Sequence, residues 1–152
     1  SMADEQQPAP QGEGEQKVLQ PVKIYIRDIS FESPNSPTIF LKDWKPQLGM
    51  ELGNSFASTK DGHHEVVLTV TITVKVGDET AYLAEVHQAG LFAIAGFDEA
   101  QIERFHHVYC NRTLYPYACA ALSDMVSRGG FPQLLLSHVN WEQIYQQKSN
   151  ES

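Results

Sequence analysis

Histidine and cysteine are the residues of this sequence that could bind a metal or act as nucleophiles, and it has six of the first and two of the second. His106 and His107 lie four and three residues before Cys110, so each could share a helix face with that thiol. A zinc site needs three or four such ligands, and neither the Cys-x-x-Cys nor the His-Glu-x-x-His spacing occurs. We therefore expect helix-surface histidines, and no metal or cofactor held by this chain.

A cysteine nucleophile would need a neighbouring base and a loop that stabilises an oxyanion. Cys110, His106 and Glu103 are the residues that a small Cys/His enzyme or a small-ligand-binding protein would use. Neither cysteine follows a Gly-rich strand-to-helix turn, and glycine-rich phosphate loops are missing as well. Cys119 follows Cys110 by nine residues on a helical stretch, too far for an unstrained disulfide. We expect a protein that is not an enzyme.

Apolar side chains outside the expected helices and strands say more about function than the histidines and cysteines do. Phe40 and Trp44 lie in an expected crossover, and Phe131 begins an apolar loop between expected helices. A small core beneath these loops would absorb part of the set. The rest would form an exposed apolar patch, which usually marks binding, and loops of this composition suit promiscuous recognition. The candidate groove lining is Phe40, Trp44, Leu48, Met50, Leu52, Phe131, Leu134, Leu136 and Trp141.

Carboxylates form the second candidate surface. Asp28 and Glu32 share one face of an alternating segment, and Leu83 and Glu85 share one face of another. If the two strands adjoin, three carboxylates and a leucine form an exposed acidic platform with an apolar contact. The alternative is an ordinary solvated sheet face.

The elements that position these residues begin with an alternating strand over 23–32, which must end at the two prolines of 34–37. Residues 48–52 predict a second, weaker strand. The strongest strand is expected over 66–76, with aliphatic residues on one face and mainly threonines on the other, and its partner over 80–88.

The turn between those last two strands decides which side chains share a face. A two-residue loop would place Glu85 and His87 among the valines, and burying these charges would cost several kcal/mol. A three-residue loop, Gly77-Asp78-Glu79, pairs Val76 with Thr80 and leaves both charged side chains on the threonine face. We predict the three-residue loop.

Helical periodicity follows the strands. Asp98 can cap a first helix, and a break near Asn111 leads to a second helix, which Pro116 either opens or kinks. Gly129-Gly130 stops that helix, and Asn140 caps a short last one with a capping box. Four strands followed by helices predict an α+β fold, a four-stranded antiparallel sheet with helices packed on one face.

Composition divides the chain into three parts. Residues 1–20 are polar and rich in Gln, Glu, Gly and Pro, so we expect a disordered N-terminal arm. Residues 21–146 form a single domain. Residues 147–152 are polar and are expected to be a flexible C-terminal tail.

Charge and hydropathy bound the function. The formal net charge is −8, with 19 Asp and Glu against 11 Lys and Arg, which disfavours nucleic acid and attracts basic partners. No apolar run reaches the ~18–20 residues that span a bilayer, and no secretory signal pattern opens the sequence. Two cysteines are too few for a disulfide framework. We expect a cytoplasmic protein without direct membrane insertion.

With these segments in place, the sequence resembles the SecB family of bacterial export chaperones. The similarity is spread over nearly the whole expected domain, and the order and spacing of its segments make it specific. The matching segments are 25–32 (Tyr-Ile-Arg-Asp-Ile-Ser-Phe-Glu), 34–37, 42–44, 77–86, 90–92, 95–96, 114–118, 125–129 and 131–134. Cys110-Asn111-Arg112 and Cys119-Ala120 depart from the usual Cys-Pro-Asn and Arg-Glu, which puts details of assembly in doubt more than function.

The resemblance implies a homotetramer, a dimer of dimers, that binds unfolded preproteins in long apolar grooves and delivers them to the translocase motor SecA. SecA would dock by its basic zinc-binding tail, so that zinc belongs to the partner. The implied SecA-binding positions are Asp28, Glu32, Leu83 and Glu85. The implied positions on which oligomerisation depends are Tyr82, Ala84, Val86 and Gln88.

Two classes of function therefore remain. The leading class is a cytosolic holdase that targets its clients to SecA, and a SecB-like chaperone dedicated to one antitoxin is its close variant. The rival class is the small enzyme or ligand-binding protein built on Cys110.

Overall fold

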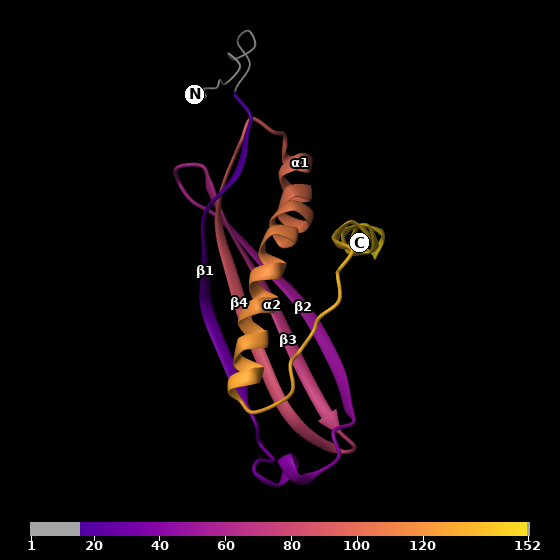
Figure 1. Ribbon diagram of the computed structural model, residues 1–152. Helices are drawn as coiled ribbons and strands as arrows, with labels where there is room; N and C mark the ends of the chain where they lie inside the picture. Colours follow the sequence, from indigo (N-terminus) through magenta and orange to yellow (C-terminus); the bar gives the residue numbers. More distant parts are fainter. Residues whose placement is uncertain (1–15, 152) are drawn as a thin grey trace, which may run out of the picture.

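Four antiparallel strands form one sheet, and the helices follow them along the chain (Figure 1). The computed structural model describes residues 16–151. The strands are β1 (Val18–Glu32), β2 (Pro46–Ser58), β3 (His63–Val76) and β4 (Glu79–Ala95), in the sheet order β1-β4-β3-β2. The helical elements are η1 (Thr38–Leu41), α1 (Glu99–Arg104), η2 (Phe105–Cys110), α2 (Asn111–Arg128) and α3 (Trp141–Glu151). The predicted α+β fold is confirmed.

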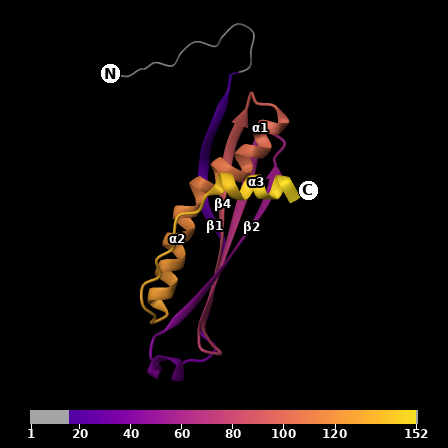
Figure 2. The ribbon, with the colours of Figure 1, turned by 90° about the vertical axis from the view of Figure 1, so that its right-hand side faces the viewer.

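Alternation along β3 from Leu68 onward gives the sheet one buried and one open face. Val66, Leu68 and Val70 are completely buried against the helices, whereas Thr69 and Thr71 between and beyond them are only partly covered. Successive side chains of a strand point to opposite faces, so this pattern fixes which face the helices must cover. Figure 2 shows the long helical segment on one side of the sheet.

The β3–β4 turn is shorter than predicted, yet the predicted register is correct beyond it. Only Gly77, with φ 63°, and Asp78 lie outside the strands, because Val76 pairs with Glu79. The positive φ suits glycine, which has no Cβ to clash. A bulge at Ala81 then restores the register. From that point the valine face of β3 meets the apolar face of β4.

The first strand is longer than predicted and is not regular. It starts at Val18, so residues 18–20 of the expected disordered arm belong to the sheet, while residues 1–15 lie outside the described part. The register shifts between Ile26, opposite Gln88, and Asp28, opposite His87. This bulge at Arg27 breaks the alternation that the sequence suggested for 23–32.

The helices α1, η2 and α2 form one continuous segment, so the expected break near Asn111 is wrong. Asp98 caps it as predicted, with its side chain accepting a hydrogen bond from the backbone N–H of Gln101 at 2.8 Å. The interruption is a π-helical turn, η2, rather than a loop. Pro116 lies inside α2, which ends at Gly129 and Gly130.

The last helix is longer than the sequence suggested. The Asn140 side chain caps it as predicted, by accepting a hydrogen bond from the backbone N–H of Gln143 at 3.0 Å. The helix continues to Glu151, so residues 147–151 are helical where we expected an irregular tail. Within residues 16–151, no helix is long and apolar enough to cross a membrane.

Candidate functional site

An aromatic cluster joins three segments that are distant in sequence. Phe131, in the loop between α2 and α3, lies 4.8 Å from Phe40, 4.9 Å from Tyr82 and 5.7 Å from Trp44, measured between ring centroids. The crossover between β1 and β2 supplies two of these rings and β4 supplies one. The α2–α3 loop is therefore held against the sheet by contacts between tilted rings.

Two adjoining hollows flank this cluster, and we call them together the apolar groove. One has a volume of about 280 Å³ and the other about 180 Å³, and they share Trp44 and Pro132. The larger hollow is lined by Trp44, Pro46, Leu48, Val74, Tyr82, Pro132, Gln133, Leu134 and Leu135. The smaller one is lined by Ile39, Phe40, Lys42, Trp44, Gly130, Phe131 and Pro132. Lys42 is the one charged side chain in either lining.

The predicted groove residues divide into two groups. The first group, Phe40, Trp44, Leu48, Phe131 and Leu134, lines the groove. The others, Met50, Leu52, Leu136 and Trp141, pack against the core and are absent from either lining.

Trp141 shows that a list of apolar residues includes core residues as well as surface residues. It is only 5 % exposed, and its ring meets that of Tyr115 edge to face at 5.5 Å. The prediction also missed Leu135, which is 79 % exposed, and the groove residues Val74 and Tyr82. The alternation of β3 and β4 had already placed those two on the helix-facing side, and this signal could have found them.

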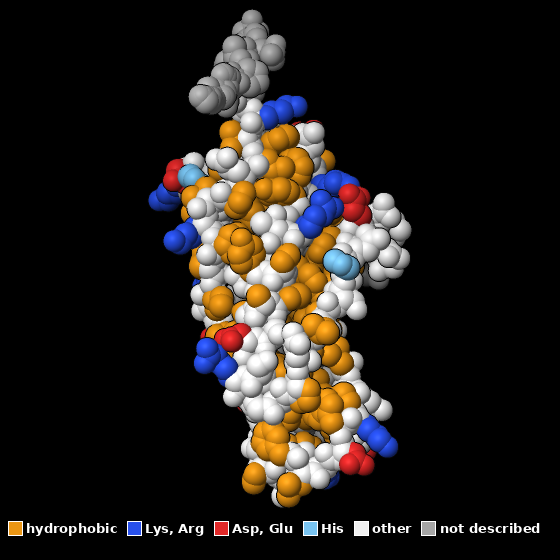
Figure 3. Space-filling model, viewed as in Figure 1, with side chains coloured by type: hydrophobic (Ala, Val, Ile, Leu, Met, Phe, Trp, Pro, Cys, Tyr) orange, Lys and Arg blue, Asp and Glu red, His pale blue; other side chains and the backbone are white. Residues whose placement is uncertain are grey.

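The helix-bearing face of the molecule carries many apolar side chains, interspersed with uncharged polar side chains and backbone (Figure 3). Apolar side chains run down this face to the end where the crossover lies, and most charged side chains lie at its margins. Among the exposed large apolar residues are Phe40, Trp44, Leu48 and Leu135. Exposed apolar surfaces of this kind are typical of binding sites.

The acidic residues come together on the opposite face of the sheet. Across the β1–β4 ladder, Asp28 pairs with His87, and Glu32 pairs with Leu83. Between these pairs, Ser30 pairs with Glu85. The four predicted platform residues therefore lie on adjacent positions of one sheet face, which we call the acidic face. Alternation predicted which residues of each strand share a face, and the structure shows that β1 adjoins β4, which the sequence analysis had left as a condition.

Glu85 is held by two neighbours that the sequence analysis did not select. The Thr71 hydroxyl donates to one of its carboxylate oxygens at 2.8 Å, and Nε2 of His87 contacts the other at 2.7 Å. The hydrogen bond from His87, followed by the one from Thr71, lowers the pKa of the Glu85 carboxyl. Glu51 of β2 continues the row, since it pairs with Thr71 on the same face. The pairing of β3 with its two neighbouring strands was the signal that could have identified Thr71, His87 and Glu51.

The positions implied for oligomerisation are buried within the chain itself. The exposed fractions of Tyr82, Ala84, Val86 and Gln88 are 0–3 %, beneath the helices. The Gln88 amide donates to the backbone oxygen of Tyr25 at 3.2 Å. As placed, these side chains offer no surface to a second copy, so any effect on assembly would pass through the packing of this core.

The Cys/His set of the rival hypothesis is not assembled as a nucleophile. Cys110 is completely buried, and burial raises the pKa of its thiol to about 12, which opposes formation of a thiolate. Nε2 of His106 lies 3.0 Å from Nδ1 of His64. Cys110 and Cys119 are both free cysteines. Among the described residues, no three His, Cys, Asp or Glu side chains come together as a metal site.

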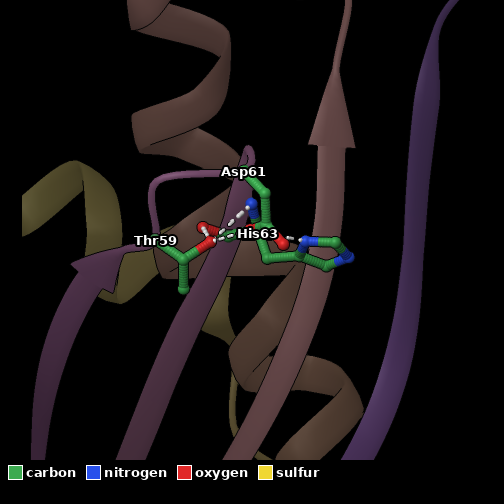
Figure 4. Close-up of polar contacts among 3 residues, drawn as sticks. All are labelled: Thr59, Asp61 and His63. Atoms are coloured by element: carbon green, nitrogen blue, oxygen red, sulfur yellow. Dashed lines mark hydrogen bonds and ion pairs between the residues drawn. The ribbon is translucent and has the colours of Figure 1, made fainter.

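A second polar cluster lies at the β2–β3 turn (Figure 4). The Thr59 hydroxyl donates to the Asp61 carboxylate, and Nδ1 of His63 lies 3.0 Å from the same carboxylate oxygen. These two hydrogen bonds, with Thr59 the larger cause, lower the pKa of Asp61 to about 2. The hydroxyl donates to the carboxylate and not to the imidazole, and a carboxylate with so low a pKa is a weak base, so the arrangement closes a turn and does not activate the hydroxyl.

Comparison with known proteins identifies the family. The family model described as SecB, preprotein translocase subunit SecB, matches residues 12–152. This chain belongs to the SecB family. The protein-export protein SecB of Hydrogenovibrio crunogenus is 50 % identical over 133 residues, covering 88 % of this chain and 89 % of that one. That of Halorhodospira halophila is 46 % identical over 135 residues, covering 89 % and 78 % respectively.

A solved structure agrees with the fold. A SecB-like chaperone of Mycobacterium tuberculosis, solved in complex with a ChAD peptide from an antitoxin, has a TM-score of 0.68 to this chain. The two are 16 % identical, and the match covers 81 % of this chain and 91 % of the other. At this identity the likeness supports the architecture alone.

Proposed function

We propose that this SecB-family chain is a protein-export chaperone that holds unfolded preproteins in the apolar groove and passes them to SecA through the acidic face. The observation that carries this proposal is the open groove around Trp44 and Phe131. It combines exposed apolar side chains with a lining that is almost free of charge. The relatives are named protein-export proteins, which supports a role in export.

The groove suits a client without a defined fold. An unfolded chain loses conformational entropy when it is held, so its affinity must come from several modest apolar contacts. Burial of one large apolar side chain contributes ~1.5–3 kcal/mol. The groove offers several such side chains, and Gln133 and Lys42 are the long polar side chains in its lining. Recognition would therefore depend on apolar content and hardly on sequence.

The acidic face suits a basic partner, and we propose the basic zinc-binding tail of SecA. A single exposed ion pair contributes at most ~1 kcal/mol, so no one carboxylate suffices. Asp28, Glu32 and Glu85 act together, and Leu83, opposite Glu32 at one end of the row, adds apolar burial. The zinc would be bound by the partner.

We also propose that the chain works as a homotetramer, a dimer of dimers, in the cytoplasm. Native mass spectrometry of the full chain should then give a mass of four copies. A monomer at micromolar concentration would contradict the proposed tetramer, but it would not contradict client binding in the groove.

The groove is tested by removing two of its exposed side chains, Trp44→Ser with Leu48→Ser. Their exposed fractions are 36 % and 48 %, so the fold should survive, whereas Leu134 is only 7 % exposed and is a poorer choice. Affinity for a reduced, carboxymethylated and hence permanently unfolded protein should fall about tenfold or more in fluorescence anisotropy. Leu41→Ser is the control, since Leu41 is 87 % exposed and lies outside either lining. Equal affinities for both variants would refute the groove.

The acidic face is tested by Asp28→Asn, Glu32→Gln and Glu85→Gln in one variant. Calorimetry with the zinc-loaded SecA tail should show binding by the unchanged protein, weaker binding as salt rises, and none by the variant. The control removes the same charge elsewhere, by Asp43→Asn, Glu103→Gln and Asp124→Asn. A tail that binds the first variant as tightly as the second would exclude this face.

The dedicated-chaperone alternative predicts a different preference. Such a protein would bind one antitoxin segment far more tightly than it binds unrelated unfolded chains, and would not need SecA. Tail binding together with broad client capture separates the export function from it.

A further inference from the structure

His87 lies at one end of the acidic face, two residues from Glu85 on β4. It pairs with Asp28 across the β1–β4 ladder and with Thr69 across the β3–β4 ladder. Its Nε2 lies 2.7 Å from Glu85, and its Nδ1 lies 3.5 Å from the Thr69 hydroxyl. About a third of the side chain, 34 %, is exposed, so the imidazole remains accessible to solvent protons.

Both carboxylate oxygens of Glu85 are already engaged in the free protein. Thr71 binds one and His87 binds the other, and the two contacts fix the carboxylate on the sheet surface. A cation that arrives at Glu85 must share the second oxygen with the imidazole of His87. Whether that imidazole is neutral or charged therefore matters to the cation.

The charged groups around His87 are mostly negative. Asp28 faces it from β1 and Glu85 from β4, while Glu51 lies on the same face of β2 beyond Thr71. Arg27 lines the same open hollow as His87, and is paired with Glu65 at 3.2 Å. Histidine is the side chain whose charge ordinarily changes between pH 5 and 8, and His87 is the histidine among these groups.

We infer that His87 is a positioning residue that sets the strength of the acidic face according to pH. The inference rests on the proposed function, in which this face binds a basic tail. When neutral, His87 donates its Nε2 hydrogen to Glu85 and holds the carboxylate without cancelling its charge. When protonated, it forms an ion pair with Glu85 and removes one of the negative charges that attract the tail.

The sign follows from proton linkage. A cationic tail binds the form with neutral His87 more tightly, so binding expels a proton and affinity rises as pH rises through the histidine range. At separations of several ångström in water, one unit charge changes the affinity for a cation about two- to fivefold.

Calorimetry between pH 5.5 and 8.5 tests this, with the full chain and the zinc-loaded SecA tail as probe. His87→Gln keeps a hydrogen-bond donor without the titratable charge, His87→Ala removes both, and His138→Gln is the remote control. We expect the affinity of the unchanged protein and of the control to rise a few-fold more over this range than that of His87→Gln. Titration of the tail itself affects every variant alike. At pH 8, His87→Gln should bind like the unchanged protein and His87→Ala more weakly.

The outcomes separate the inference from the function on which it rests. Parallel pH profiles for the unchanged protein and His87→Gln, with both binding, would overturn the role of His87 and leave the acidic face in place. Loss of binding by His87→Gln at every pH would mean that the imidazole contacts the tail directly, which also overturns it. Absence of binding by the unchanged protein at all pH values would refute the SecA contact itself.

Discussion

The two faces of β4 carry two different surfaces, although their residues alternate along one strand. On the helix side, Tyr82 belongs both to the buried core and to the floor of the apolar groove, so folding and binding depend on the same side chains. On the other side, Leu83 and Glu85 lie on the acidic face, which none of the helices within residues 16–151 covers. Substitutions on the open face of β4 should therefore change binding with little effect on the free energy of unfolding. Substitutions of buried groove residues should change both.

The largest expected effect comes from placing a charge on the covered side of β4. Val86 is completely buried, so Val86→Asp should cost about 4 kcal/mol or more and leave an unfolded or aggregated chain. Glu85→Ala, one residue away on the open side, should change the free energy of unfolding by about 1 kcal/mol or less. Urea denaturation followed by circular dichroism measures both. Similar losses for the two variants would mean that the two faces are not distinct.

A smaller effect is expected where the groove meets the end of α2. A Cβ on Gly129 would approach the ring of Phe31 to 2.3 Å, and that ring is stacked with Tyr82 at 5.7 Å. Gly129→Ala should therefore lower the free energy of unfolding by about 1–3 kcal/mol, because the ring must shift within packed neighbours.

Phe31→Leu provides the internal test of this explanation. If the clash is the cause, Gly129→Ala should cost less in the Phe31→Leu background, as a double-mutant cycle would show. Gly49→Ala is the control on the acidic side of the sheet, where the nearest atom lies 3.8 Å from the new Cβ. It should be neutral or slightly stabilising in thermal melts.

The regular parts of this molecule were the predictable ones. Alternation in β3 and β4 was enough to place Glu85 opposite the helices, and the register argument reached the right pairing even though the turn is two residues long and Ala81 bulges. The argument succeeded because it was based on burial of charge, which tolerates a local error in the turn. The bulge at Arg27 left a signal that the sequence analysis did not use, because the apolar residues change parity there, from Ile24 and Ile26 to Ile29 and Phe31.

The groove was less predictable because its shape depends on loops. A list of apolar residues cannot distinguish Trp141, which packs inside against Tyr115, from Leu135, which is exposed. That difference is decided by the path of the α2–α3 loop, which depends on long-range contacts such as Phe131 with Phe40. Propensity and periodicity describe only local preferences, so they are silent on this path.

A moderate, pH-dependent effect is expected near the helix side of the sheet. Burial, followed by the charges of His64 and His107, lowers the pKa of His106 from 6.5 to about 4. Between pH 4 and 6.5, His106 is therefore mostly neutral in the folded chain and mostly protonated in the unfolded chain. The free energy of unfolding is therefore unaffected by this histidine above pH 6.5, and it decreases as the pH falls from 6.5 toward 4.

After allowance for solvent screening of this half-buried side chain, we expect a loss of about 1–2 kcal/mol over that window. His106→Phe should flatten the profile and retain the stacking on Phe56, whose centroid is 5.0 Å away. His138→Gln, at an exposed loop position, should leave the profile unchanged. Urea denaturation at pH 4.5, 5.5 and 7.5 makes the measurement.

The smallest expected effect is on the acidic face. In the Asp28→Asn, Glu32→Gln, Glu85→Gln variant, the contacts of Glu85 with Thr71 and His87 become weaker. Against this, Glu85 lies diagonally across the ladder from both other carboxylates, and the variant removes their mutual repulsion. Exposed ion pairs and hydrogen bonds contribute at most ~1 kcal/mol, so the free energy of unfolding should stay within about 0.5 kcal/mol of the original value. Urea denaturation of this variant beside Trp44→Ser with Leu48→Ser gives the comparison. A loss above 2 kcal/mol in the acidic-face variant would show that this face supports the fold, and the weaker SecA binding expected of that variant could then no longer be assigned to charge alone.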